Sequence, residues 1–441
     1  MSKQIGNQEP KKIFFGFDGL DNIGLYVKTH GVDEKIKKIE HSLSENGSPW
    51  NIYHFTETIS NNAENADITA LQDAILNSNR ADVIYAFARN IEGSNKKLLQ
   101  EALIKTGDAE HAYFFARDIK GADVKALQDV VTNSDSADSI YKFARDIKGA
   151  DIRALQNALI KTNKVKYFYY FALDVENADV KALGEAMYNV DSEKPAEYDR
   201  AYLYYNFAKY VKNADINFLQ NAVIKTQNGH CIYSFARNIE GADVQVLSEG
   251  MKNSYDPENI YNFARNVKGA DINALTQAMV NCYETKYKGC CAGTPVYKFA
   301  RDIKGADINA LQNAVLNAGN PIIIYKFARD IEGADTKLLS KGMDKWWGIL
   351  IYKYARNIKG ADIELLSKSM AKNHEIDRAK NIYKFAHNIK GANIEVLQDA
   401  IIQTGDLEYI NKFSRNVKGA KKIVVKKPSL EDKIDEMIKN L

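Results

Sequence analysis

The sequence predicts an all-α protein, an elongated α-solenoid of about thirteen two-helix repeats. Three observations support this fold class. A short motif recurs along most of the 441 residues with a basic period of 28. Apolar residues within each copy recur at helical spacing, and a Gly-Ala-Asp connector separates two such stretches. Because helices of about 9 to 12 residues are too short to be stable alone, each must pack against its neighbours.

An aromatic residue anchors each copy of the motif. Successive anchors are most often 28 residues apart, and two gaps of 36 residues correspond to one period plus an eight-residue insertion. The anchors are Phe55, Phe87, Phe115, Phe143, Phe171, Phe207, Phe235, Phe263, Phe299, Phe327, Tyr354, Phe385 and Phe413. This recurrence places an α-helical repeat region at residues 51–420.

The copy that begins at Ile140 shows why each repeat should contain two helices. On a helical wheel of about 100° per residue, Ile140, Phe143 and Ile147 share one face and predict a buried stripe. Gly149 follows where a left-handed helix end is expected, and Asp151 stands where the next helix needs an N-terminal cap. Apolar residues then resume at helical spacing, namely Ile152, Leu155, Ala158 and Leu159.

Residues 1–50 lack the repeat and form a predicted N-terminal cap. Ile13–Phe17 and Ile23–Val27 resemble two short strands around a turn at Asp18-Gly19. A helical stripe follows, made of Val32, Ile36, Ile39 and Leu43. We therefore expect a small ββα cap.

Residues 421–441 form a third predicted segment. Lys421–Lys427 is basic and extended, and Ser429 then caps an amphipathic helix. One face of that helix carries Leu430, Ile434, Met437 and Leu441. The helix either covers the last repeat or docks onto another chain.

Three segments interrupt the period. Asp191–Asp199 and Tyr283–Thr294 are insertions that follow the second helix of their repeats, so both should project from the same edge. Lys345–Gly348 contains Trp346 and Trp347 in place of the usual loop. These tryptophans either form a contact site or pack into the next repeat.

The first helix of most repeats carries a Tyr two residues before the anchor and an Arg two residues after it. These two residues are four apart and touch along one helix face, which the wheel turns away from the core stripe. Such a ladder could hold a phosphate backbone and stack bases. Alternatively, each Arg bridges to the Asp or Asn beside it, or to an Asp of the adjacent Gly-Ala-Asp connector, and holds the repeats in register.

A basic stripe is confined to the last five repeats, where the residue just before the anchor becomes Lys. The candidate partner-binding residues are Tyr297, Lys298, Arg301, Tyr325, Lys326, Arg329, Tyr352, Lys353, Arg356, Tyr383, Lys384, His387, Lys412 and Arg415. From residue 295 onward, 26 Lys and Arg stand against 18 Asp and Glu, although the net charge of the whole chain is only +3. The stripe is either an anion-binding surface or an ordinary solvated face.

No catalytic or cofactor motif is present, so we expect no catalytic residue and no cofactor. The spacing of the four cysteines, Cys231, Cys282, Cys290 and Cys291, does not match a zinc site, so we expect no metal. No apolar run approaches the roughly 20 residues of a membrane span, and no secretory signal precedes the repeats. These features predict a cytoplasmic protein without membrane contact.

The connector, the short paired helices and the tandem array resemble the α-solenoid class that includes HEAT, Sel1-like and tetratricopeptide proteins. The period is shorter than is usual for these families, and none of their signatures matches residue by residue. The string F-A-R-D-I-K-G-A-D-I also resembles tandem repeats in uncharacterised proteins of large DNA viruses, phages and low-GC bacteria. The resemblance implies such a source, with location in a host cytoplasm or virion, and implies no activity.

Three functions remain open on the sequence alone. The first is a non-catalytic scaffold that binds a protein or peptide along its repeat surface. The second is nucleic-acid or polyanion binding through the basic stripe, which should weaken steeply with salt. The third is sequestration of a small ligand, or an enzyme with an unrecognised site.

Overall fold

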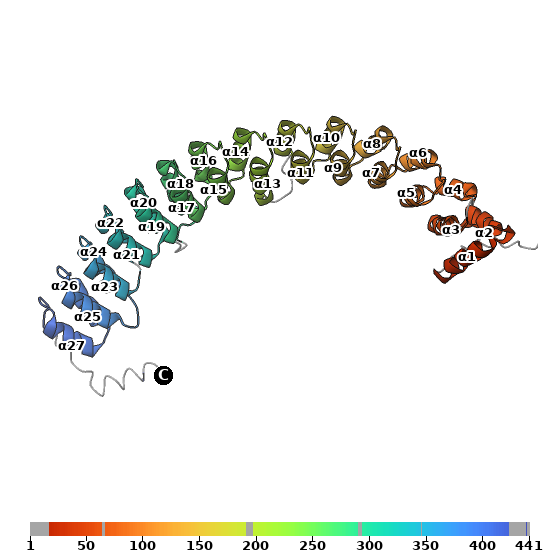
Figure 1. The fold of residues 1–441 in the computed structure, drawn as a ribbon. Coiled ribbons are helices and arrows are strands. Elements are labelled where there is room, and N and C mark those ends of the chain that lie inside the picture. Colours follow the sequence, from red (N-terminus) through yellow and green to blue (C-terminus); the bar gives the residue numbers. More distant parts are fainter. Residues whose placement is uncertain are drawn as a thin grey trace, which may run out of the picture. The chain divides into compact units, whose positions relative to one another are not determined.

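The computed structural model describes residues 17–63, 67–190, 197–289, 293–344, 346–422 and 438. These residues form 27 α-helices and two short 3-10 helices, and no strand occurs among them (Figure 1). The expected all-α class is confirmed for this part of the chain. No helix in these ranges has both the length and the apolar content that crossing a membrane requires.

The helices belong to two compact units, which are described separately. The first unit contains residues 1–195 and 206–215 and the second contains residues 196–205 and 216–441, so that the boundary falls within α13 (Glu197–Tyr210). The other helices of the first unit are α1 (Phe17–His30), α2 (Glu34–Asn46), α3 (Pro49–Asn62), α4 (Thr69–Leu76), α5 (Ala81–Asn90), α6 (Lys96–Thr106), α7 (Ala109–Asp118), α8 (Val124–Thr132), α9 (Ala137–Asp146), α10 (Ile152–Lys161), α11 (Val165–Asp174) and α12 (Val180–Asn189).

The helices of the second unit continue the same alternation. They are α14 (Ile216–Lys225), α15 (Gly229–Asn238), α16 (Val244–Gly250), η1 (Met251–Asn253), α17 (Pro257–Asn266), α18 (Ile272–Glu284), α19 (Thr294–Asp302), α20 (Ile308–Ala318), α21 (Pro321–Asp330), α22 (Thr336–Ser340), η2 (Lys341–Met343), α23 (Gly348–Asn357), α24 (Ile363–Lys372), α25 (Arg378–Asn388), α26 (Ile394–Gln403) and α27 (Leu407–Asn416).

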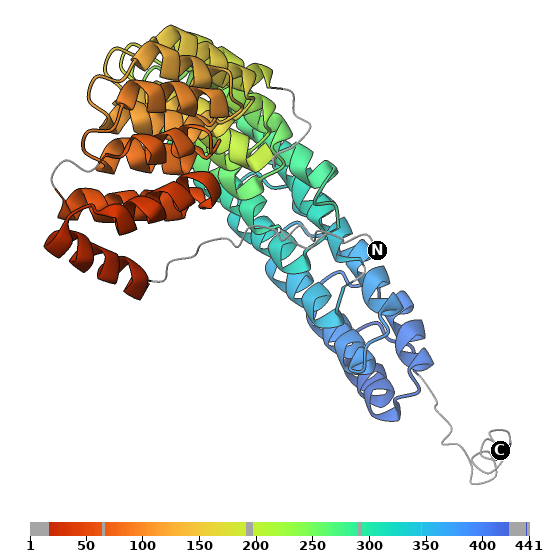
Figure 2. The same cartoon turned by 90° about the vertical axis from the view of Figure 1, so that its right-hand side faces the viewer.

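Within each unit, consecutive helices pair and the pairs stack. In the first unit, α7 packs on its partner α8 and also on the equivalent helices α5 and α9. In the second unit, α25 packs in the same way on α26, α23 and α27. First helices therefore form one layer and second helices the other (Figure 1 and Figure 2).

The aromatic anchors form the core between these layers. Every one of the thirteen is at most 1% exposed. Around Phe143, the predicted stripe residues Ile140 and Ile147 are buried as well. Their partners on the second helix, Leu155 and Leu159, are fully buried. Each apolar face is thus covered by a neighbouring helix, as a short amphipathic helix requires.

The connector has the predicted geometry. Gly149 has a φ of +84°, a left-handed conformation that a side chain disfavours. Asp151 then caps α10 by accepting a 3.0 Å hydrogen bond from the backbone N–H of Ala154. In two copies the left-handed position is filled by Asn177 and Asn213, because Asn tolerates this conformation better than other residues with side chains.

The predicted ββα cap is wrong. Ile23–Val27, expected as a strand, and Gly19 of the expected turn lie inside α1, while all of Ile13–Phe17 except Phe17 lies outside the described residues. Val27 is buried and α1 packs on α3. A Cβ on Gly24 would lie 3.3 Å from the side chains of Thr58 and Asn62, so this glycine allows the close approach. The following helix α2 forms as expected, capped by Asp33.

The remaining expectations about interruptions have mixed outcomes. The second insertion was expected to project, but α18 continues through its first residues, and Cys282 and Tyr283 are fully buried. Residues 191–196 of the first insertion and 423–437 of the C-terminal segment lie outside the described residues. Trp347 is 66% exposed, whereas Trp346 is half-buried.

Candidate interaction surface

The tyrosines of the ladder lie between consecutive first helices, where their hydroxyls join one repeat to the next. Tyr113 on α7 donates a 2.6 Å hydrogen bond to Asp146 at the end of α9. Equivalent bonds join Tyr85 to Asp118, Tyr141 to Asp174, Tyr261 to Asp302 and Tyr297 to Asp330. Most of these tyrosines are buried or nearly so, although the helical wheel turns them away from the core stripe. The wheel describes one helix, whereas the stacked neighbour covers a second face.

An arginine closes each of these contacts. Arg117 donates to the hydroxyl of Tyr113 at 3.3 Å and to the carboxylate of Asp118 at 2.7 and 2.9 Å. Hydrogen bonds from Arg117 and from Tyr85 hold the pKa of Asp118 at about 2. Burial is the main cause that raises the pKa of Tyr113. The carboxylate compensates the arginine charge, so these rungs of the ladder are structural contacts.

Other rungs use Asn in place of Asp. Asn266 donates a 3.1 Å hydrogen bond to the hydroxyl of Tyr233, and four further pairs have the same arrangement. They are Asn90 with Tyr53, Asn238 with Tyr205, Asn357 with Tyr325 and Asn416 with Tyr383. An amide keeps the contact between repeats but carries no charge. The arginine beside each Asn therefore lacks the adjacent carboxylate that its equivalents have.

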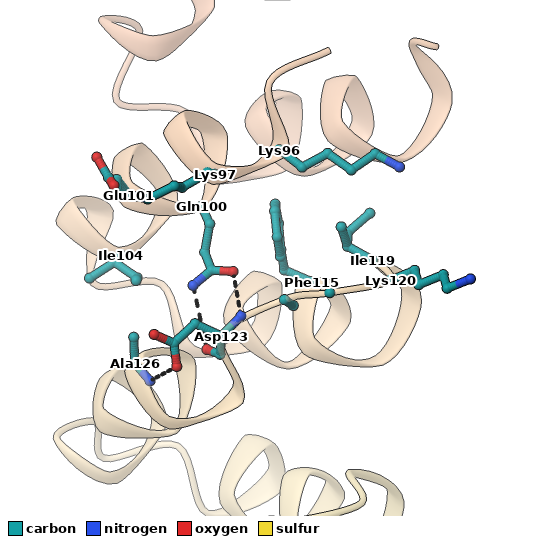
Figure 3. A pocket seen from close by; sticks show the side chains of 12 residues that line it. Lys96, Lys97, Gln100, Glu101, Ile104, Phe115, Ile119, Lys120, Asp123 and Ala126 are labelled. Carbon is teal, nitrogen blue, oxygen red and sulfur yellow. Dashed lines mark hydrogen bonds between the residues drawn. The ribbon is translucent and has the colours of Figure 1, made fainter. Parts of the chain in front are cut away.

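A second set of contacts between repeats was not predicted. Gln100 on α6 is buried, accepts a 2.9 Å hydrogen bond from the N–H of Asp123 and donates to the carbonyl of Asp123 at 3.4 Å (Figure 3). Equivalent bonds run from Asn95 to Gln72, Asp151 to Gln128, Asp179 to Gln156, Asp243 to Gln220, Asp335 to Gln312 and Lys421 to Gln398. The recurrence of Gln directly after a buried Leu was the signal in the sequence that could have found them.

The small cavity beside Gln100 follows from this contact. It encloses about 330 Å³ and is lined by side chains of α6, α7 and the connector, including Lys97, Ile104 and Phe115 (Figure 3). Gln100 reaches across it to Asp123, and its amide is occupied by that bond. The cavity therefore reflects the way two repeats meet.

The fourteen residues of the predicted basic stripe do not share one environment. Tyr297 and Tyr352 are buried, and Tyr325 and Tyr383 are half-buried. The remaining cations differ in their partners. Arg301 and Arg329 bind Asp302 and Asp330, Lys298 lies 3.4 Å from Glu258, and Lys412 binds Glu408. A ring nitrogen of His387 lies 3.1 Å from the carbonyl of Asn416.

Three lysines of the stripe are left without an ion pair in the described ranges. They are Lys326, Lys353 and Lys384, at equivalent positions on α21, α23 and α25. Arg356 and Arg415 belong to rungs that use Asn, and Arg356 donates to the hydroxyl of Tyr352 at 3.3 Å. Within the described ranges, the cations of the stripe that have no carboxylate partner therefore lie on the first helices of the last repeats.

A groove of about 720 Å³ lies beside Lys384. It is lined by Trp347 and Ile349 at the start of α23, by residues 374–377, and by Lys380, Asn381 and Lys384 of α25. Three apolar side chains are exposed along it, because Trp347 is 66%, Ile349 is 37% and Ile376 is fully exposed. This groove combines the tryptophan interruption and the basic stripe of the sequence in one place.

The part of the chain that the structure describes contains no cluster of three His, Cys, Asp or Glu side chains that could hold a metal ion. Cys231 and Cys282 are free and buried, while Cys290 and Cys291 lie outside the described residues. No protein-family model matches the chain, and no curated protein matches its sequence significantly. The surface itself must therefore carry the functional argument.

Proposed function

We propose that this chain is a non-catalytic interaction scaffold that binds a protein or peptide partner along its repeat surface. The observation that carries the proposal is the exposed apolar groove at Trp347, Ile349 and Ile376. Large apolar side chains that gather at the surface are typical of protein contact sites. The polar side chains of the ladders are occupied by contacts between repeats, so they support the surface more than they serve as a reactive site.

The same proposal includes the architecture that presents the surface. Thirteen buried anchors, twelve of which are followed by a second helix in the described ranges, support an elongated α-solenoid of about thirteen repeats. Such an array offers a long surface because each repeat adds length without enlarging one central core. A cytoplasmic location and an origin in a large DNA virus, phage or low-GC bacterium are part of this proposal and come from the sequence alone.

Affinity purification with the full-length chain as bait tests the proposal. Proteins captured from an extract of the source organism, or of its infected host, are identified and then prepared in pure form. We expect at least one to bind the wild-type chain directly in isothermal titration calorimetry. A chain that binds none of the purified candidates, and that proves to turn over a substrate instead, would contradict the scaffold function.

Polyanion binding is the second candidate, and it is favoured by Lys326, Lys353 and Lys384, which make no ion pair with any residue that the structure describes. A phosphate backbone that displaces counterions from these lysines would give an affinity that falls linearly in log–log plots against salt. Fluorescence anisotropy with a labelled single-stranded DNA of 20 nucleotides measures this slope. A flat response at low salt would remove this candidate.

A further inference from the structure

The groove beside Lys384 lies where the repeat pattern changes. Residues 373–377 lengthen the connection between α24 and α25, and Trp346 and Trp347 precede α23. Most other equivalent connections have two to four residues, such as the three between α10 and α11. The two altered connections belong to consecutive repeats whose first helices α23 and α25 are in contact. Both connections therefore line the same groove.

Hydrogen bonds hold the two connections together. The side-chain amide of Asn373 donates to the carbonyl of Trp346 at 2.8 Å. The N–H of Gly348 donates to both carboxylate oxygens of Glu375 at 3.1 Å, and the N–H of Glu375 donates to Asn373 at 3.1 Å. These bonds satisfy polar atoms of both connections within the protein. The apolar side chains of Trp347 and Ile376 nevertheless stay exposed to solvent.

The side chains at the rim of the groove are apolar and exposed, and contact between apolar side chains and water is energetically unfavourable. Trp347 and Ile376 come from different connections, and each is more than half exposed. Ile349 adds a third apolar side chain at the first turn of α23. An exposed aromatic with aliphatic neighbours is the kind of surface that a bulky apolar side chain of a partner covers.

Lys384 is the charged side chain of the groove that favours an acidic occupant. Lys380 and Lys384 lie one helical turn apart on α25 and both line the groove. Of the two carboxylates in the lining, Glu375 is bound to the N–H of Gly348, and Asp377 lies 3.7 Å from Lys380. No ion pair engages Lys384 in the described ranges, and Lys353 holds the equivalent position on α23.

We propose that this groove binds an acidic peptide segment that carries a bulky apolar side chain. The apolar side chain covers Trp347, Ile349 and Ile376, and a carboxylate of the segment pairs with Lys384, since Lys380 already lies 3.7 Å from Asp377. This inference rests on the proposed scaffold function and names its partner class. A nucleic acid fits less well, because a bound strand stacks successive bases on aromatic rings, and Trp347 is the one Trp, Tyr or Phe side chain in the lining, beside two isoleucines.

A phage-displayed library of random 12-residue peptides, selected on the full-length chain, tests the inference. We expect enriched peptides to combine Asp or Glu with Trp, Phe, Leu or Ile. An enriched peptide is then synthesised with a fluorescein label for anisotropy. Trp347→Ala and Lys384→Glu should each weaken its binding at least about tenfold, as expected for an apolar anchor and a charge reversal.

Matched variants elsewhere control for general effects. Ile402→Ala removes an apolar side chain that is 44% exposed on α26, and Lys304→Glu reverses an exposed lysine in a connector. Both should leave the affinity within about twofold. Circular dichroism and thermal unfolding of all four variants exclude a loss of fold.

The outcomes separate the two proposals. Peptides whose binding is unaffected by Trp347→Ala and Lys384→Glu would overturn the groove and leave the scaffold function standing. Enriched peptides that are basic, or selection of none, would also overturn the groove, and the affinity purification would then decide the scaffold function alone. Binding of single-stranded DNA that both variants weaken, with no peptide enriched, would assign the groove to nucleic acid instead.

Discussion

The hydroxyl of Tyr113 donates a 2.6 Å hydrogen bond to Asp146, which lies 33 residues later in the next repeat. The same offset joins Tyr85 to Asp118 and Tyr297 to Asp330. A contact repeated at one sequence offset is a link between neighbours, and it explains why the first helices stay in register. The stability of each repeat should therefore depend on such links.

Removal of the Tyr113 hydroxyl tests one link. Tyr113→Phe should destabilise the contact between α7 and α9 by about 1 kcal/mol, because a partly buried hydrogen bond to a charged acceptor is lost. Hydrogen exchange of the α7 and α9 amides measures the change. Tyr170→Phe is the matched control, since the Tyr170 hydroxyl has no hydrogen bond among the described residues and should have little effect. Equal effects of the two variants would contradict the structural role of the link.

The buried glutamines should be as important as the tyrosines. Gln156 is 5% exposed, accepts from the N–H of Asp179 at 2.8 Å and donates to its carbonyl at 3.3 Å. Gln156→Leu leaves the N–H of Asp179 without a partner, at a cost of about 1–3 kcal/mol, whereas the carbonyl of Asp179 keeps its bond from the N–H of Leu183. Exchange of the Asp179 amide should accelerate at least about tenfold, as that free energy implies. Asn157→Leu, on the exposed side of the same helix, should leave it unchanged.

Acid should weaken the rungs that use Asp. The pKa values of Asp118 and Asp302 are held at about 2, mainly by hydrogen bonds from Arg117 and Arg301. A folded pKa below the unfolded value gives stability that is present above about pH 4 and lost as the pH falls toward 2. Each carboxylate should contribute about 1 kcal/mol or less, because solvent screens these partly exposed pairs.

Urea unfolding between pH 5 and pH 2.5 measures this dependence. The double variant Asp118→Asn, Asp302→Asn keeps hydrogen-bonding amides, as the chain does at Asn266. It should lose less stability on acidification than the wild-type chain. An identical dependence on pH in both proteins would show that the arginine contacts do not hold the two carboxylates ionised.

Cys231 and Cys282 should be inert in the folded chain. Both are fully buried, and burial raises the pKa of each thiol to about 12. At pH 8 both therefore remain protonated and shielded from reagents. Iodoacetamide should label them only after unfolding in urea, as followed by mass spectrometry of the peptides that contain them. Labelling of either thiol in the native chain at the unfolded rate would contradict its burial.

The helix pairs were predictable because their signals are local. The spacing around Phe143, the glycine at 149 and the cap at Asp151 each act within a few residues, and the structure has all three as expected. The repeat strengthens the prediction, because a similar pattern recurs at successive anchors. The N-terminal helix α1 was not predicted, because Ile23–Val27 lies outside the repeat and its apolar pattern is equally compatible with a short strand.

Contacts between repeats were harder to predict, because they join residues far apart in the sequence, most often 23 or 33 positions. On a single helix, Tyr113 points away from the stripe of Phe115, yet the next repeat buries it. Gln156 reads as a surface residue until the backbone of Asp179 is placed beside it. The groove at Trp347 and Ile376 is formed by two segments that do not follow the repeat pattern, so that pattern could not predict where they lie.

The central claim is that each helix pair persists only through its nearest neighbours. Hydrogen exchange along the full-length Leu159→Ala variant tests it most directly, because this fully buried side chain on α10 should cost about 2–5 kcal/mol when truncated. We expect protection to fall in α9, α10 and α11, to fade within one or two repeats, and to remain unchanged in α23–α26. A uniform loss of protection across all the described helices would indicate one cooperative core and would contradict the account.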